Sequence, residues 1–74
     1  MNFSVFLKKE RQEKGLSLRG LAELSGISKD SIRKYESCAM EPTIGAVNAI
    51  CKAFGMALVA IPISDKEGRE RHAL

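Results

Sequence analysis

Apolar side chains between residues 3 and 54 recur at intervals of three and four positions, which is the period of amphipathic α-helices. Helices are expected over residues 3–14, 18–25, 28–37 and 44–54. The last three each begin beside a hydroxyl residue that can cap a helix N-terminus, namely Ser17, Ser28 and Thr43. Four short helices with short connections favour a compact all-α globule.

The apolar stripe of each helix indicates which side chains should pack together. These side chains are Phe3, Phe6 and Leu7 on the first helix, Leu18, Leu21, Ala22 and Leu24 on the second, Ile32 and Tyr35 on the third, and Ile44, Val47, Ile50, Cys51 and Phe54 on the fourth.

Gly26 separates the second and third helices by a tight turn. A glycine just past the last apolar position can adopt the left-handed conformation that reverses the chain. At about 100° per residue, the side of the third helix opposite Ile32 and Tyr35 is polar; it carries Lys29, Asp30, Arg33, Lys34 and Ser37. Long donors on a short exposed helix suit the DNA major groove, where each base pair has its own donor and acceptor pattern. The helix pair is therefore interpreted as a DNA-reading device.

Arg11 lies on the apolar side of the first helix, four positions after Leu7. A buried charge needs a partner, and Glu36 at the end of the third helix is the expected one. The alternative is that Arg11 extends to solvent.

The run 56–63 departs from the helical pattern, because Val59, Ile61 and Ile63 alternate with other small or apolar residues as in a strand. A lone strand leaves its backbone groups unpaired, so we expect it to pair with the same segment of a second subunit. Leu58, Val59, Ile61 and Ile63 would then form the dimer contact. The alternative is an extended tail lying across the globule. Residues 64–74 are charged and lack aromatic side chains, and are expected to be disordered.

Charge and composition narrow the class of protein. The 74 residues suffice for one small domain, and the whole net charge of +3 falls within residues 1–54, which weakly favours a polyanionic partner.

Cys38 and Cys51 lack the spacing of a zinc site, so reduced thiols are expected, with Cys51 as a core filler and redox sensing at Cys38 as an alternative. His72 is the single histidine, and no phosphate-binding glycine loop is present, so neither an enzyme nor a cofactor or metal site is expected. A start without secretory character and a longest apolar run of eight residues favour a cytoplasmic protein without a membrane span.

These features together resemble the Cro/repressor-type (xenobiotic-response-element, XRE) helix-turn-helix family over residues 3–56. The residues that carry the resemblance are Arg11, Gly15-Leu16-Ser17, Leu21-Ala22, Ser25-Gly26-Ile27-Ser28, Ile32, Tyr35-Glu36, Pro42-Thr43-Ile44 and Ala53-Phe54-Gly55. The resemblance implies a lambda-repressor-like domain in residues 1–55. Residues 56–63 resemble more loosely the dimerising strand of antitoxin-type members, on apolar alternation alone.

The resemblance also assigns roles to individual residues. Base reading is implied for Ser28, Lys29, Asp30, Arg33 and Lys34, phosphate contact for Ser17, Arg19 and Ser37, and a structural ion pair for Arg11 with Glu36. Asp30 repels phosphate, so it either accepts from a cytosine amino group or rejects sites that offer an acceptor.

Three positions depart from the family pattern. Leu18 stands where a phosphate-contacting glutamine is frequent, Gly20 replaces a polar helix former, and Cys38 replaces the glycine that commonly ends the recognition helix. Gly20 is expected to cost about 1 kcal/mol of helix stability, and Cys38 is expected to adopt a strained conformation.

The sequence therefore predicts a dimeric, sequence-specific DNA-binding regulator, acting as a repressor on a near-palindromic operator. Two alternatives remain: an antitoxin that also binds a toxin protein, and a protein-interaction module that uses the same fold without DNA.

Overall fold

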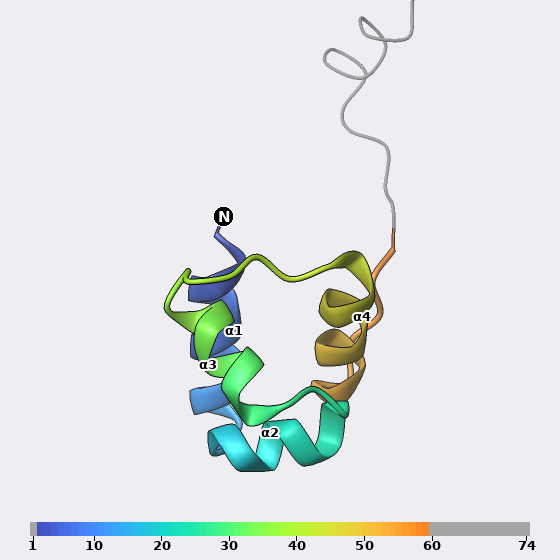
Figure 1. The fold of residues 1–74 in the computed structure, drawn as a ribbon. Helices are drawn as coiled ribbons and strands as arrows, with labels where there is room; N and C mark the ends of the chain where they lie inside the picture. Colours follow the sequence, from blue (N-terminus) through green and yellow to red (C-terminus); the bar gives the residue numbers. More distant parts are fainter. Residues whose placement is uncertain (1, 60–74) are drawn as a thin grey trace, which may run out of the picture.

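The structure, a computed structural model, describes residues 2–59, in which four α-helices form (Figure 1). These are α1 (Phe3–Glu13), α2 (Leu18–Ser25), α3 (Lys29–Glu36) and α4 (Ile44–Ala53). The all-helical prediction is thus confirmed for the described part of the chain. Helix ends differ by one residue at most from the expected bounds, as usual where end positions are half inside a helix.

Side-chain caps explain where the helices begin. Ser17, Ser28 and Thr43 each accept a hydrogen bond from the backbone N–H three residues ahead, at 2.9, 3.1 and 3.0 Å. α1 is capped by Asn2, whose Oδ1 accepts from the Ser4 backbone N–H at 2.8 Å. All four helices therefore start at a residue that satisfies a free N–H group.

Left-handed residues explain where the helices end. Gly26, with φ 78°, closes α2 and gives the tight turn before α3. α3 ends with the same backbone geometry at Cys38, a non-glycine residue with φ 64°. The Cys38 N–H bonds to the Tyr35 carbonyl at 3.2 Å and the Ala39 N–H to the Lys34 carbonyl at 2.9 Å, which is a Schellman motif. The strained conformation predicted for Cys38 is therefore present.

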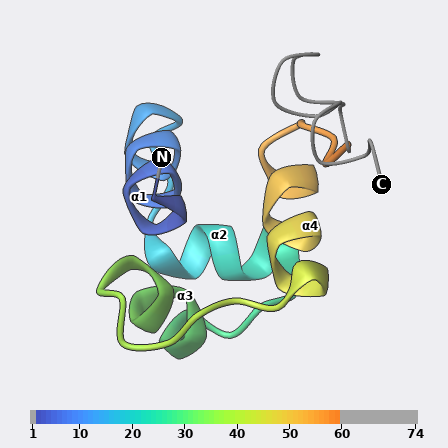
Figure 2. The same cartoon turned by 90° about the horizontal axis from the view of Figure 1, so that it is seen from above.

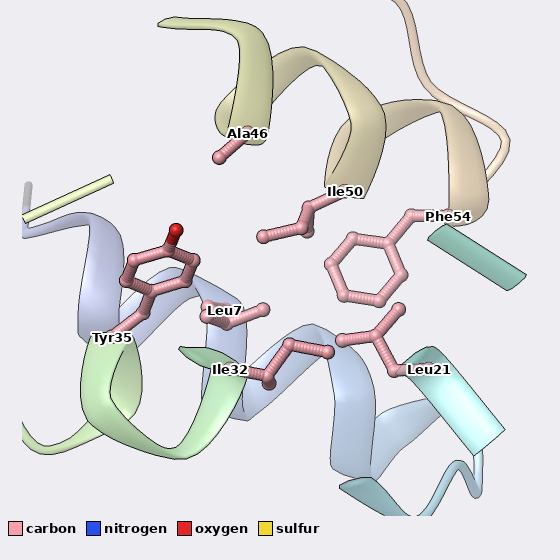
Figure 3. Close-up of a cluster of buried hydrophobic side chains, with 7 residues drawn as sticks. All are labelled: Leu7, Leu21, Ile32, Tyr35, Ala46, Ile50 and Phe54. Carbon is pink, nitrogen blue, oxygen red and sulfur yellow. The ribbon is translucent and has the colours of Figure 1, made fainter. Parts of the chain in front are cut away.

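The helices surround one apolar core. α2 packs against both α3 and α4, and α1 packs against α3. The loop after α3 runs across to the start of α4, and α2 lies between α1 and α4 (Figures 1 and 2). Seven buried side chains from all four helices or their caps meet in the centre (Figure 3): Leu7, Leu21, Ile32, Tyr35, Ala46, Ile50 and Phe54. The expectation that Ile32 and Tyr35 form the packed side of α3 is confirmed.

Two side chains assigned to the core are exposed instead. Ile44 is 77% exposed at the first position of α4. Leu24 is 60% exposed in the last turn of α2, about 60° around the axis from the fully buried Leu21. Cys51, by contrast, is buried as expected.

The predicted strand is described only in part. Residues 56–59 have no helix or strand assignment, and Met56 packs against the core whereas Leu58 and Val59 are exposed. Ile61 and Ile63, like the charged tail 64–74, lie outside the described residues.

Candidate nucleic-acid interface

The outer side of α3 is polar and accessible. Arg33 and Lys34 are 58% and 44% exposed at their side chains, and Asp30 is 61% exposed. Ser28 and Lys29, at the start of the helix, are also exposed. The residues expected to read bases therefore lie on the solvent side of a helix whose opposite side is fixed in the core.

Asp30 forms ion pairs with two of these cations. Its Oδ1 accepts from Arg33 Nη2 at 2.7 Å, and its Oδ2 lies 3.2 Å from Lys34 Nζ. The hydrogen bond from Arg33, followed by that from Lys34, lowers the pKa of Asp30 below its usual value. The carboxylate therefore remains charged at neutral pH and balances part of the positive charge of the helix.

The side chains of Lys29 and Ser28 differ in their contacts with other residues of the protein. No ion pair involves Lys29 within residues 2–59. The Ser28 hydroxyl donates to Ser31 Oγ at 2.9 Å while it caps α3. Lys29 is thus available to an external anion, whereas a base contact from Ser28 would compete with its bond to Ser31.

The residues expected to contact phosphate lie at helix ends. Ser17 and Arg19 are exposed at the start of α2, where free N–H groups favour an anion. Ser37 is exposed at the end of α3, and its hydroxyl donates to the Lys34 carbonyl at 3.2 Å.

Gly20 has a local reason to lack a side chain. A Cβ built at this position would lie 3.3 Å from Ser17 Oγ and 3.5 Å from Leu16 Cδ2. Since Ser17 Oγ also accepts from the Gly20 N–H, a larger residue would press on the cap of α2.

Arg11 and Glu36 are brought together beneath this surface. Arg11 Nε and Nη2 donate to the two carboxylate oxygens of Glu36 at 2.6 and 3.1 Å, and their side chains are 13% and 10% exposed. The hydrogen bond to Glu36 raises the pKa of Arg11 against the opposing effect of burial. The pair joins α1 to the C-terminal end of α3.

Four contacts were not foreseen from the sequence. The spacing of Asp30 from Arg33 and Lys34, three and four positions, was a sufficient signal for the ion pairs. No local sequence pattern predicts the hydrogen bond from Arg11 Nη1 to the Leu16 carbonyl at 2.8 Å. The same holds for the 3.0 Å contact between Cys38 Sγ and Ser4 Oγ, which is a tertiary contact across 34 positions.

Comparison with known proteins shows the family to which the chain belongs. Residues 7–61, more than half of the chain, match the helix-turn-helix family. The chain belongs to the XRE-type helix-turn-helix family. In this helix-turn-helix domain, α2 and α3 are the helices that flank the turn at Gly26.

Two curated relatives carry the same name, HTH-type transcriptional regulator PuuR, one from Escherichia coli (strain K12) and one from Shigella flexneri. Each is 36% identical to this chain over 52 residues. The match covers 70% of this chain but 28% of each relative, so the likeness concerns about a quarter of those proteins. No solved structure matches the chain. Within residues 2–59, no helix is both long enough and apolar enough to cross a membrane.

Proposed function

We propose that this helix-turn-helix domain binds double-stranded DNA sequence-specifically and regulates transcription, with α3 entering the major groove. The observation that carries the proposal is the two-sided character of α3. Ile32 is fully buried, whereas Lys29, Arg33 and Lys34 are accessible on the other side. A helix fixed in this way can present long donors to base edges at a defined angle. The family and the two regulators named above support the same reading.

The roles within the interface follow from position. Lys29, Arg33 and Lys34 supply donors to base edges or phosphates, and Asp30 lies among them. Ser17 and Arg19 at the start of α2 hold the phosphate backbone, where a helix N-terminus favours negative charge. Ser37 adds a hydroxyl at the far end of α3.

The protein acts as a homodimer and represses transcription from a near-palindromic operator. Two copies of α3 would enter successive major grooves about one helical turn apart, roughly 34 Å. Segment 56–63 joins the two copies, and the exposure of Leu58 and Val59 at the edge of the described residues supports this role.

Selection of bound sequences from a random duplex library tests the proposal. Enrichment of a two-fold symmetric site is expected, and affinity for that site should fall steeply with salt because phosphate contacts release counterions. The double substitution Arg33→Ala with Lys34→Ala should abolish selective binding. Lys8→Ala with Lys9→Ala, the same charge loss on exposed positions of α1, is the matched control.

Two results would contradict the proposal. One is unchanged operator affinity in the folded Arg33→Ala, Lys34→Ala protein. The other is the absence of any enriched site, together with partner binding insensitive to salt, which would favour a protein-interaction module.

A further inference from the structure

The arrangement of charges on α3 distinguishes Asp30 from the other exposed residues of the helix. Asp30 is in the first turn, and its two oxygens are divided between Arg33 and Lys34, at 2.7 and 3.2 Å. The only other carboxylate of α3, that of Glu36, is turned inward to Arg11. The exposed side of α3 therefore carries a single negative charge, and that charge lies against the two cations that would face DNA.

These ion pairs compete with DNA for the same donors. Arg33 Nη2 points at Asp30, and a guanidinium can present the same N–H groups to a phosphate or to a guanine edge. Because all three side chains are substantially exposed, the pairs are weak and can be exchanged for external acceptors.

The exchange is not equally favourable on every DNA sequence. On arbitrary DNA, the cations would gain phosphate contacts alone, while Asp30 would be left close to the phosphate charges. On an operator, base acceptors at fixed positions add directional hydrogen bonds that arbitrary sites lack. The ion pair uses Nη2 of Arg33, so the other guanidinium N–H groups can bond to a fixed operator base while the pair with Asp30 persists, whereas phosphate contacts on arbitrary DNA draw the cation away from the carboxylate. The opposing charge therefore lowers the affinity for arbitrary DNA by a larger factor than the affinity for the operator.

Resting on the proposed DNA-binding function, we propose that Asp30 is a specificity-determining residue that acts through Arg33 and Lys34. By holding both cations in ion pairs on α3, it suppresses binding to arbitrary duplexes more strongly than binding to the operator. The residue is a positioning and selectivity group, and it makes no base contact of its own.

The experiment compares Asp30→Asn with the wild-type chain on two duplexes, the selected operator and a scrambled duplex of the same composition. Asn has the same shape and removes the charge. Glu23→Gln is the matched control, because Glu23 is exposed on α2 and forms no ion pair within residues 2–59. Affinities are measured for both duplexes at several salt concentrations.

Asp30→Asn should raise affinity for the scrambled duplex about fivefold, corresponding to a released exposed ion pair and a lost repulsion. Operator affinity should rise less, so the ratio of the two affinities falls. Glu23→Gln should change both affinities by the same small factor. In the Arg33→Ala background, the effect of Asp30→Asn on the scrambled duplex should shrink, because one of the two paired cations is absent.

Suppose that the wild-type protein binds its operator with a steep salt dependence, so that the DNA-binding proposal holds. Two outcomes would then overturn the proposal for Asp30. The first is an unchanged affinity ratio in Asp30→Asn. The second is weaker operator binding with unaltered scrambled binding, which would show that Asp30 accepts a hydrogen bond from a base. Failure of the DNA-binding function itself would appear differently, as the lack of any salt-dependent operator binding by the wild-type protein.

Discussion

Arg11 and Glu36 form a two-pronged ion pair in which Nε donates to Oε2 at 2.6 Å and Nη2 to Oε1 at 3.1 Å. The third donor, Arg11 Nη1, reaches the Leu16 carbonyl at 2.8 Å, just before α2 begins. One guanidinium therefore connects the end of α1, the turn into α2 and the last turn of α3. The angle at which α3 projects depends on this connection as well as on the apolar core.

Glu36→Gln should strongly destabilise the domain, because it leaves the Arg11 charge buried without its counter-ion. Breaking a buried pair from one side costs about 3–5 kcal/mol, which for a domain of this size corresponds to a fall in Tm of about 15 °C or more. Thermal unfolding followed by circular dichroism measures the change.

Lys9→Ala is the control for this experiment. Its ion pair with Glu13 is 3.8 Å long, with both side chains more than half exposed, so Tm should move by only a few degrees. Equal effects of Glu36→Gln and Lys9→Ala would contradict the structural role of the Arg11 pair.

Cys38 occupies a left-handed position that glycine normally takes, so its two smallest substitutes should differ. Both substitutions lose the contact of Sγ with Ser4 Oγ, but Cys38→Gly also removes the steric conflict of the Cβ, whereas Cys38→Ala keeps it. The glycine variant should be more stable than the alanine variant by about 1 kcal/mol. Denaturant unfolding at equilibrium measures this difference, and equal stabilities would show that φ 64° carries no strain here.

Helix starts and the buried side of α3 could be predicted because the signals are local. A serine just before a run of apolar residues at helical spacing predicts an N-cap. Ile32 and Tyr35 are separated by close to one helical turn, so they are expected on the same side of α3. The exposure of Ile44 could not be read from its apolar character, because only tertiary packing decides which side of α4 faces the core. The contact of Cys38 with Ser4 likewise depends on how α1 and α3 pack.

The two helix-interior glycines should respond differently to alanine. At Gly45, an added Cβ would lie 3.8 Å from Thr43 Oγ1, an ordinary contact, so Gly45→Ala should stabilise the domain by up to about 1 kcal/mol. At Gly20, the 3.3 Å approach to Ser17 Oγ offsets the same gain. Chemical denaturation of both variants should therefore give a larger increase for Gly45→Ala. A larger increase for Gly20→Ala would mean that the cap of α2 yields without cost.

The ion pairs of Asp30 can be detected without DNA. Hydrogen bonds from Arg33 and then Lys34 lower the pKa of the carboxyl group, so the folded state binds its proton less tightly than the unfolded chain. Its contribution to stability is therefore present above the unfolded-state pKa and is lost as pH falls through the lower, folded-state pKa. NMR titration of the Asp30 carboxyl should show a midpoint below the usual range, which rises in Arg33→Ala. An unaltered midpoint in that variant would exclude the pair in solution.

The dimer proposal is best tested by a substitution that spares the core. Deleting the chain from residue 56 onward would also remove Met56, which packs against the core, so loss of the dimer could then reflect a damaged monomer. Val59 is 69% exposed, and Val59→Glu introduces one negative charge from each copy into the contact if two copies of segment 56–63 pair. Sedimentation equilibrium should show a dimer for the wild-type chain and a monomer for Val59→Glu with unchanged helical content. Val5→Glu, at a position 62% exposed on α1, should remain dimeric.

A dimer that survives Val59→Glu would place the subunit contact elsewhere, whereas dissociation by both variants would indicate a general effect of added charge.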